Sequence, residues 1–223
     1  MLQQTTLKFL KGLNKNNNKP WFDEHRKDYE EARKDFITFI QHIIDQHGKL
    51  DSSIRELHAK DCLFRINRDI RFSKDKSPYK TNFGASIDKG GKKSIYAGYY
   101  LHIEPGGQSF AGGGLWMPMP AEMKKVRQEI DYCFDEFSKI IKAKKFTSIY
   151  SELYRGEDMS LVKVPQGFEK DNPAADYIKL KSWLATTSLS DEELTSKNLS
   201  KKVLAAFEAL QPLLTFINRA LDE

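Results

Sequence analysis

Three arginines, Arg65, Arg68 and Arg71, stand close together in the segment 60–80, whose sequence is KDCLFRINRDIRFSKDKSPYK. The segment holds seven basic and three acidic residues, a net charge of +4, whereas the whole chain carries +5. The arginines are interspersed with apolar residues that favour burial, and a guanidinium is costly to bury without partners for its donors. We therefore expect each arginine to bind either an outside anion or a carboxylate of the chain itself.

Both kinds of partner fit the cluster. Arginine grips phosphate or carboxylate through two parallel hydrogen bonds, which suits a small anionic ligand. The candidate ligand-binding residues are Arg65, Arg68, Arg71, Lys76 and Tyr79. The alternative is a purely structural network in which Asp69 and Asp75 neutralise the arginines. Asp69 offers only about four lone-pair sites for three arginines, which favours the external anion and leaves the structural network open.

Acid–base chemistry has two candidates, Asp69 and His102. His102 and Glu104 are two residues apart, so on a strand they share one face, close enough to cooperate in proton transfer. The sequence leaves open whether the protein is an enzyme. Its five histidines show no ligand-like clustering, and no phosphate-binding loop or dinucleotide fingerprint occurs, so we expect no metal and no cofactor.

A second hypothesis is a nucleic-acid or partner-binding module. The basic loop would contact phosphates, and tyrosines such as Tyr96 and Tyr100 on a sheet face would stack on bases. The basic residues gather in one short segment rather than along a stripe, so we rank nucleic acid below the small anion. The oligomeric state does not follow from the sequence.

Period-two patterns predict an antiparallel meander. Alternation over 62–73 predicts a strand that presents Arg65 and Arg71 on one face, although a helix is the alternative there. Pro78 places 74–79 in a loop. Further strands are predicted over 81–88, 94–103, 108–115 and 181–187, the first three joined by glycine-containing turns.

Apolar residues at spacings of three and four predict the helices. The expected helices cover 5–14, 20–47, 53–60 with a capping box at Ser53 and Glu56, a stretch from Pro120 to Ile141, 147–155 and 200–221. No linker or repeat divides the chain. We therefore predict one α+β domain over 1–223, with a β meander of about 4–6 strands flanked by long amphipathic helices.

The composition is that of a globular protein, with 39% hydrophobic and 30% charged residues. No apolar run approaches the ~20 residues needed to cross a bilayer. The first residues lack the apolar core and cleavage site of a signal peptide. We expect a cytoplasmic protein with no membrane partner.

The run RINRDIRF at 65–72, followed by DKSPYK at 75–80, resembles the signature of an uncharacterised bacterial family, domain of unknown function 2461. The stretches LKFLKGLNKNNNKPWFDEHRKDYEEARKDF, GYYLHIEPGGQSFAGGGLWMP and LSDEEL are similar to it as well. The positions that carry the resemblance are Arg65, Arg68, Asp69, Arg71, Phe72, Asp75, Lys76 and Tyr79. The resemblance implies one full-length domain and supplies no activity or ligand.

Overall fold

The computed structural model describes residues 1–156 and 158–222. In chain order its elements are α1 (Gln4–Lys15), α2 (Lys19–Glu24), α3 (Arg26–His47), the 3-10 helix η1 (Ser52–Ile54), α4 (Ala59–Cys62), β1 (Phe83–Asp88), β2 (Gly98–Ile103), β3 (Ser109–Leu115), α5 (Pro120–Tyr132), α6 (Phe134–Lys142), α7 (Lys144–Tyr150), α8 (Ala175–Ile178), β4 (Trp183–Leu189), α9 (Asp191–Leu194) and α10 (Leu199–Asp222).

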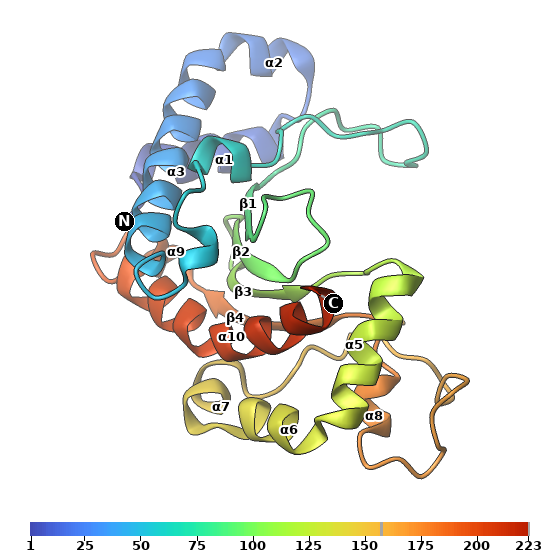
Figure 1. Ribbon diagram of the computed structural model, residues 1–223. Coiled ribbons are helices and arrows are strands. Elements are labelled where there is room, and N and C mark those ends of the chain that lie inside the picture. Colours follow the sequence, from blue (N-terminus) through green and yellow to red (C-terminus); the bar gives the residue numbers. More distant parts are fainter. Residues whose placement is uncertain (157, 223) are drawn as a thin grey trace.

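The four strands form one antiparallel sheet in the order β1-β2-β3-β4. Ala85, Leu101 and Ala111 lie opposite one another on neighbouring strands, and all three are fully buried. Helices α3 and α10 cover this inner face (Figure 1). The alternation of the sequence therefore places one apolar side of each strand against two amphipathic helices, which confirms the predicted α+β fold.

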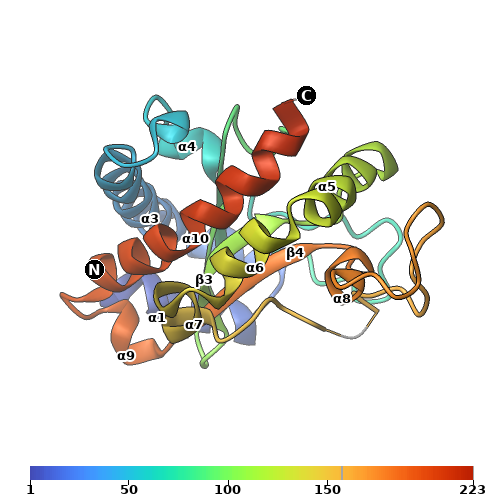
Figure 2. The same cartoon turned by 60° about the horizontal axis from the view of Figure 1, so that its bottom comes forward.

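Helix α10 lies at the centre of the helical layer. Its apolar residues pack against β2 and β3, and α5, α6 and α7 pack along it (Figure 2), with α7 also in contact with β4. The buried side chains of helices and sheet join in a single hydrophobic core. Within 1–156 and 158–222, no helix is both long and apolar enough to pass through a bilayer.

The outer face of the sheet combines glycines with aromatic rings. Gly112 lies opposite Tyr100 in the register, and the imidazole of His102 stacks on Phe110 with ring centroids 4.8 Å apart. Gly98 faces Asp88, and a Cβ atom at Gly98 would lie 1.8 Å from the carboxylate. Glycine is required there because the buried Asp88 side chain occupies that space.

Both edges of the sheet are occupied by short segments outside the strands. On the β1 edge, Leu63 forms a bridge with Ala85, and Phe64 N–H donates to the carbonyl of Gly84 at 3.0 Å. On the β4 edge, Tyr154 N–H donates to the carbonyl of Leu184 at 2.7 Å. The outermost main-chain groups therefore have partners at these points.

The four strands that were predicted to begin at 81, 94, 108 and 181 are confirmed, and their observed bounds differ from the predicted ones by up to four residues. Three helix predictions had the wrong bounds. The helix expected over 147–155 covers Lys144–Tyr150 instead. The helix expected over 20–47 is interrupted at His25, whose Nδ1 lies 2.9 Å from the Trp21 carbonyl, and the helix expected from Pro120 to Ile141 is interrupted at Cys133. The helix expected over 53–60 is replaced by η1 and α4, and Asp51 rather than Ser53 caps η1.

The strand predicted over 62–73 was wrong, and so was the helical alternative. After α4 the chain makes isolated bridges at Leu63 and at Asn67, which pairs with Tyr79. Residues 67–79 then form a protruding loop (Figure 1), which we call the signature loop. Its polar side chains bond to nearby main-chain groups, as when Asp69 accepts from Arg71 N–H at 3.3 Å, and such local bonds compete with a strand ladder.

Candidate functional site

A polar hollow of about 340 Å³ lies where the α1–α2 connection meets the base of the signature loop. Its walls come from segments far apart in the sequence. The lining residues are Asn14, Asn17, Arg68, Asp75, Ser77, Tyr79, Lys80, Thr81 and Asn82. The formal charges of this lining are two cations and one carboxylate, so the hollow carries a net positive charge.

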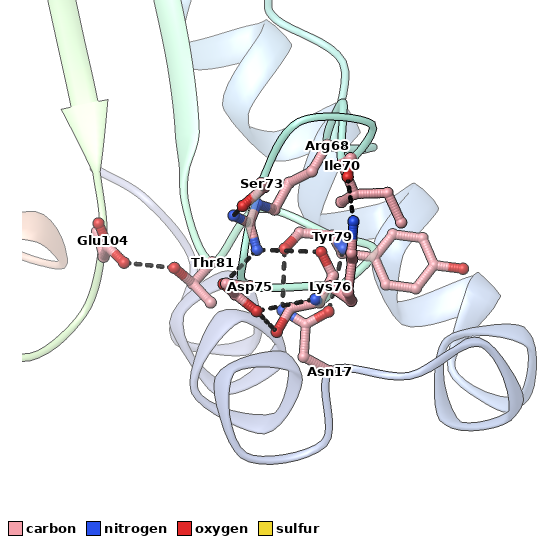
Figure 3. Close-up of polar contacts among 10 residues, drawn as sticks. Asn17, Arg68, Ile70, Ser73, Asp75, Lys76, Tyr79, Thr81 and Glu104 are labelled. Atoms are coloured by element: carbon pink, nitrogen blue, oxygen red, sulfur yellow. Dashed lines mark hydrogen bonds and ion pairs between the residues drawn. The ribbon is translucent and has the colours of Figure 1, made fainter.

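Arg68 holds the base of the loop together (Figure 3). Its Nη1 donates to the Asp75 carboxylate and, at 3.1 Å, to the carbonyl of Ser77, while Nη2 lies 3.4 Å from Ser73 Oγ. Asp75 also accepts from the main-chain N–H and the hydroxyl of Ser77, at 2.9 and 2.7 Å. The bonds from Ser77, and then the bond from Arg68, lower the pKa of Asp75 to about 2, so this carboxylate stays ionised.

Asn17 fixes the opposite wall. Its carboxamide accepts from Tyr79 N–H at 3.1 Å and donates to the Tyr79 carbonyl at 2.9 Å. The Tyr79 ring is buried and stacks on Phe22, with centroids 4.0 Å apart. The phenol points away from the Arg68–Asp75 contacts (Figure 3). Tyr79 therefore anchors the loop to α2, and its main chain carries the polar contacts.

Lys80 is the distinctive cation of the hollow. The side chain is half-buried, and its ammonium lies 5.3 Å from the centroid of the Phe64 ring. Within the described part of the chain Lys80 forms neither an ion pair nor a side-chain hydrogen bond. Burial, with a smaller contribution from the nearby charge of Arg65, lowers the pKa of Lys80. A half-buried cation that no carboxylate of the described residues pairs with favours an anion from outside.

A chain of hydrogen bonds leads from the hollow to the outer face of the sheet. The Thr81 hydroxyl donates to Glu104 (Figure 3), and the other oxygen of Glu104 lies 3.0 Å from His102 Nε2. The Tyr100 hydroxyl lies 3.5 Å from His102 Nδ1. Glu104 thus fixes the orientation of the imidazole, and Thr81 is the one member of the chain that borders the hollow.

The three arginines do not converge on one pocket. Arg71 is exposed and forms a two-point contact with Asp69, with Nε–Oδ1 and Nη2–Oδ2 distances of 3.0 and 2.6 Å. Arg65 is exposed and lies near enough to Lys80 to affect its pKa. Lys76 donates to the carbonyl of Ile70 at 3.0 Å. Of the predicted ligand-binding residues, Arg68 and Tyr79 line the hollow, whereas Arg65, Arg71 and Lys76 lie outside its lining.

The two acid–base candidates are held in different places. Asp69 pairs with Arg71 on the signature loop, and His102 lies on β2 behind Glu104. Neither lines the hollow. Residues 1–156 and 158–222 contain no group of three or more histidine, cysteine, aspartate or glutamate side chains that could hold a metal ion.

Comparison with protein families gives one match. The family described as "Conserved hypothetical protein (DUF2461)" matches residues 5–216. The chain belongs to this family. Among curated proteins no match to this DUF2461 member was found, and no solved structure matches it either. The family description names no activity, so the function is inferred from the geometry of the hollow.

Sequence reasoning on this DUF2461 protein located the signature loop but missed most of the hollow. Asn14 and Asn17 lie in the Asn-rich run before Pro20, which resembles helix-capping sequence. Lys80, Thr81 and Asn82 directly follow the loop, where their side chains carry no special pattern. The run of three consecutive asparagines at 16–18 exceeds what one helix cap needs, and it was the available signal for a second role.

Proposed function

We propose that the hollow binds a small anion that bears a phosphate or carboxylate group. The observation that carries the proposal is Lys80, a half-buried cation that borders the hollow and has no carboxylate partner in the described chain. A buried charge is stabilised when a counter-charge reaches it, and the Asp75 carboxylate is already engaged by Arg68 and Ser77.

Neutral donors complete the candidate site. Asn14 and Asn82 line the hollow, and their carboxamides form no hydrogen bond within residues 1–156 and 158–222. Carboxamide N–H groups donate to anionic oxygens, and the Thr81 hydroxyl is a further polar contact. Arg68 adds a second positive charge at the rim. Together these groups provide donors from both sides of the hollow, as binding of a tetrahedral or planar oxyanion requires.

The other predicted residues take different parts in this proposal. Arg65 adds a long-range positive field beside Lys80. Arg71, Lys76 and the Tyr79 ring shape the loop rather than contact the anion. Asp69 and His102 stay predictions as acid–base residues. The contacts of Arg68 and Arg71 inside the loop also agree with the structural alternative, and binding measurements separate the two hypotheses.

The test is isothermal titration calorimetry with inorganic phosphate, sulfate and citrate. We expect saturable binding of at least one of these anions to the unmodified protein. The variant Lys80→Gln should bind at least tenfold more weakly, because it loses the charge and keeps most of the side-chain length. Lys93→Gln, at an exposed position outside the hollow, is the matched control and should bind normally.

Circular dichroism establishes that the two variants are folded, and Lys80→Arg should restore much of the affinity. If the unmodified protein binds none of the anions, the proposal fails. Equal affinities for Lys80→Gln and Lys93→Gln would also refute the proposal, because Lys80 would then not contact the bound anion.

A further inference from the structure

The tip of the signature loop exposes a single aromatic ring. Phe72 is 95% exposed, the largest exposed fraction of any aromatic side chain described in residues 1–156 and 158–222. The loop extends away from the sheet and helices (Figure 1). An apolar ring in water is unfavourable, and a ring placed at the end of a protruding loop is available to a partner rather than to the core of its own chain.

Near Phe72 the acidic side chains are paired, whereas a basic side chain is left for a partner. The two acids of the loop are engaged inside it, because Asp69 pairs with Arg71 and Asp75 with Arg68 and Ser77. Lys74 is exposed and has no ion-pair partner among the described residues. The surface that the tip presents to solvent is therefore cationic, and it belongs to the segment that carries +4 of the total charge of +5.

Contacts within the loop fix the positions of these groups. Asp69 holds the Arg71 guanidinium through two hydrogen bonds, and this guanidinium lies 5.8 Å from the centroid of the Phe72 ring. Lys76 Nζ donates to the carbonyl of Ile70, and at the base Arg68 N–H donates to the carbonyl of Pro78 at 2.9 Å. The ring and the cations are thus oriented before any partner arrives, which lowers the entropy cost of binding.

We propose that the tip of the signature loop binds single-stranded nucleic acid, with a base stacked on Phe72 and adjacent phosphates bound by Arg71 and Lys74. Unpaired bases offer their ring faces to an aromatic side chain, whereas a duplex conceals them. An anionic membrane fits less well, because one phenylalanine inserts too little apolar area for stable attachment. The interaction is separate from the hollow and does not depend on anion binding at Lys80.

Fluorescence anisotropy with labelled dT12 and U12 oligonucleotides at 50 mM and 200 mM salt tests the proposal. We expect weak, salt-sensitive binding of at least one oligonucleotide, which Phe72→Ala reduces about tenfold through loss of stacking. Lys74→Ala should lower the slope of log affinity against log salt by about 0.7, the value for one phosphate contact on a single strand.

Val162 and Lys163 supply matched controls. Val162 is 96% exposed and Lys163 is an exposed lysine in a different loop. Val162→Ala and Lys163→Ala should bind the oligonucleotide like the unmodified protein. Circular dichroism shows whether Phe72→Ala is folded. We expect it to be, because Phe72 is exposed and packs on no core residue of the described chain.

Three outcomes overturn the proposal: no oligonucleotide binding at 50 mM salt, equal binding by Phe72→Ala and Val162→Ala, or tighter binding to a 12-base-pair duplex than to the single strand. Sedimentation with phosphatidylserine vesicles supplies the competing test. Vesicle binding that needs Phe72, in a protein that ignores the oligonucleotides, would assign the tip to membranes instead.

Discussion

The carboxamide of Asn17 forms two hydrogen bonds with the main chain of Tyr79, accepting from its N–H at 3.1 Å and donating to its carbonyl at 2.9 Å. The two residues are 62 positions apart in the sequence. A side chain thus takes the place of a neighbouring strand for one residue of the signature loop. This pair joins the α1–α2 connection to the loop and fixes the width of the hollow between them.

Replacing Asn17 by alanine should destabilise the protein by about 1–3 kcal/mol, because it leaves both polar groups of a buried residue without partners. Urea unfolding monitored by circular dichroism measures the change. Asn14→Ala is the control, since the Asn14 side chain forms no hydrogen bond in the described residues and should change the free energy of unfolding by less than about 0.5 kcal/mol. Equal effects of the two substitutions would contradict the pairing.

The arginines of the signature loop should differ sharply in their effect on stability. Arg68→Ala removes contacts to Asp75, Ser77 and Ser73 and should cost about 1–2 kcal/mol. Arg71→Ala breaks only a solvent-exposed pair with Asp69 and should leave the free energy of unfolding unchanged within error. Urea unfolding of both variants checks this, and a large loss with Arg71→Ala would favour the purely structural role of the whole cluster.

The meander was predictable because its strands carry one apolar side each and are separated by strong turn signals. The breaks at His25 and Cys133 were not, because neither position carries a proline or glycine, and at Cys133 the apolar spacing of three and four continues. The segment 62–73 misled for a related reason. Its alternation of apolar and polar residues is real, but Asn67 pairs with Tyr79 for a single rung and local bonds from Asp69 and Asp75 then curl the chain into a loop.

The candidate site was also predictable only in part. The high density of basic residues identified the signature loop, because the net charge of a short segment does not depend on the fold. It could not show that Asp69 turns to Arg71, or that Lys80 and not Arg71 borders the hollow. Those facts depend on side-chain directions within an irregular loop and on Asn17, which the tertiary fold brings from another element.

Asp88 should contribute more to stability in mild acid than at neutral pH. Burial raises the pKa of Asp88 to about 6, above the 3.8 of the unfolded chain, and its carboxylate accepts hydrogen bonds from the Ser86 hydroxyl. The folded state therefore holds the proton more tightly, so its contribution is present below pH 4 and is lost as the pH rises through 6. Asp88→Asn should raise the free energy of unfolding at pH 7.5 by about 2–3 kcal/mol, because the variant no longer buries a charge.

Denaturant unfolding at pH 7.5 and pH 4 checks this effect of Asp88→Asn. The gain should be much smaller at pH 4, where Asp88 is protonated in the folded state and only partly ionised in the unfolded chain. The exposed Asp158→Asn serves as the reference substitution. A gain of the same size at both pH values would show that the effect is one of packing and not of charge.

His47 has the opposite dependence on pH. Its ring is buried edge-on against the stacked pair Tyr99 and Phe207, and neither nitrogen has a hydrogen-bond partner in the described structure. Burial lowers the pKa of His47 from 6.5, although the charge of Asp51 opposes the shift. The unfolded chain then takes up the proton more readily, so stability present above pH 6.5 is lost as the pH falls through the folded-state pKa.

The substitution His47→Phe should remove this part of the acid sensitivity. Thermal unfolding between pH 7.5 and pH 5 measures it, and the midpoint of the variant should fall less over this range than that of the unmodified protein. His42→Gln, which changes an exposed histidine, should keep the full dependence. Parallel curves for His47→Phe and the unmodified protein would contradict the prediction.

Gly98 should tolerate no side chain. A Cβ atom there would lie 1.8 Å from the Asp88 carboxylate and 2.8 Å from the Asp88 Cα, so the clash involves the main chain as well as the side chain. Gly98→Ala should cost at least about 3 kcal/mol, the upper range for overpacking. Gly91→Ala, in a turn with φ of +89° and open space around it, should cost about 1 kcal/mol from strain alone. The urea concentrations at which Gly98→Ala and Gly91→Ala are half unfolded measure the two costs.

The Leu63–Ala85 bridge and the Tyr154–Leu184 hydrogen bond have a consequence for behaviour at high concentration. A four-stranded sheet normally presents two rows of main-chain donors and acceptors on which a second molecule can template a fifth strand. Here each row is interrupted by a segment of the same chain. Intermolecular strand addition, the usual start of ordered aggregation, therefore requires one of these segments to detach first.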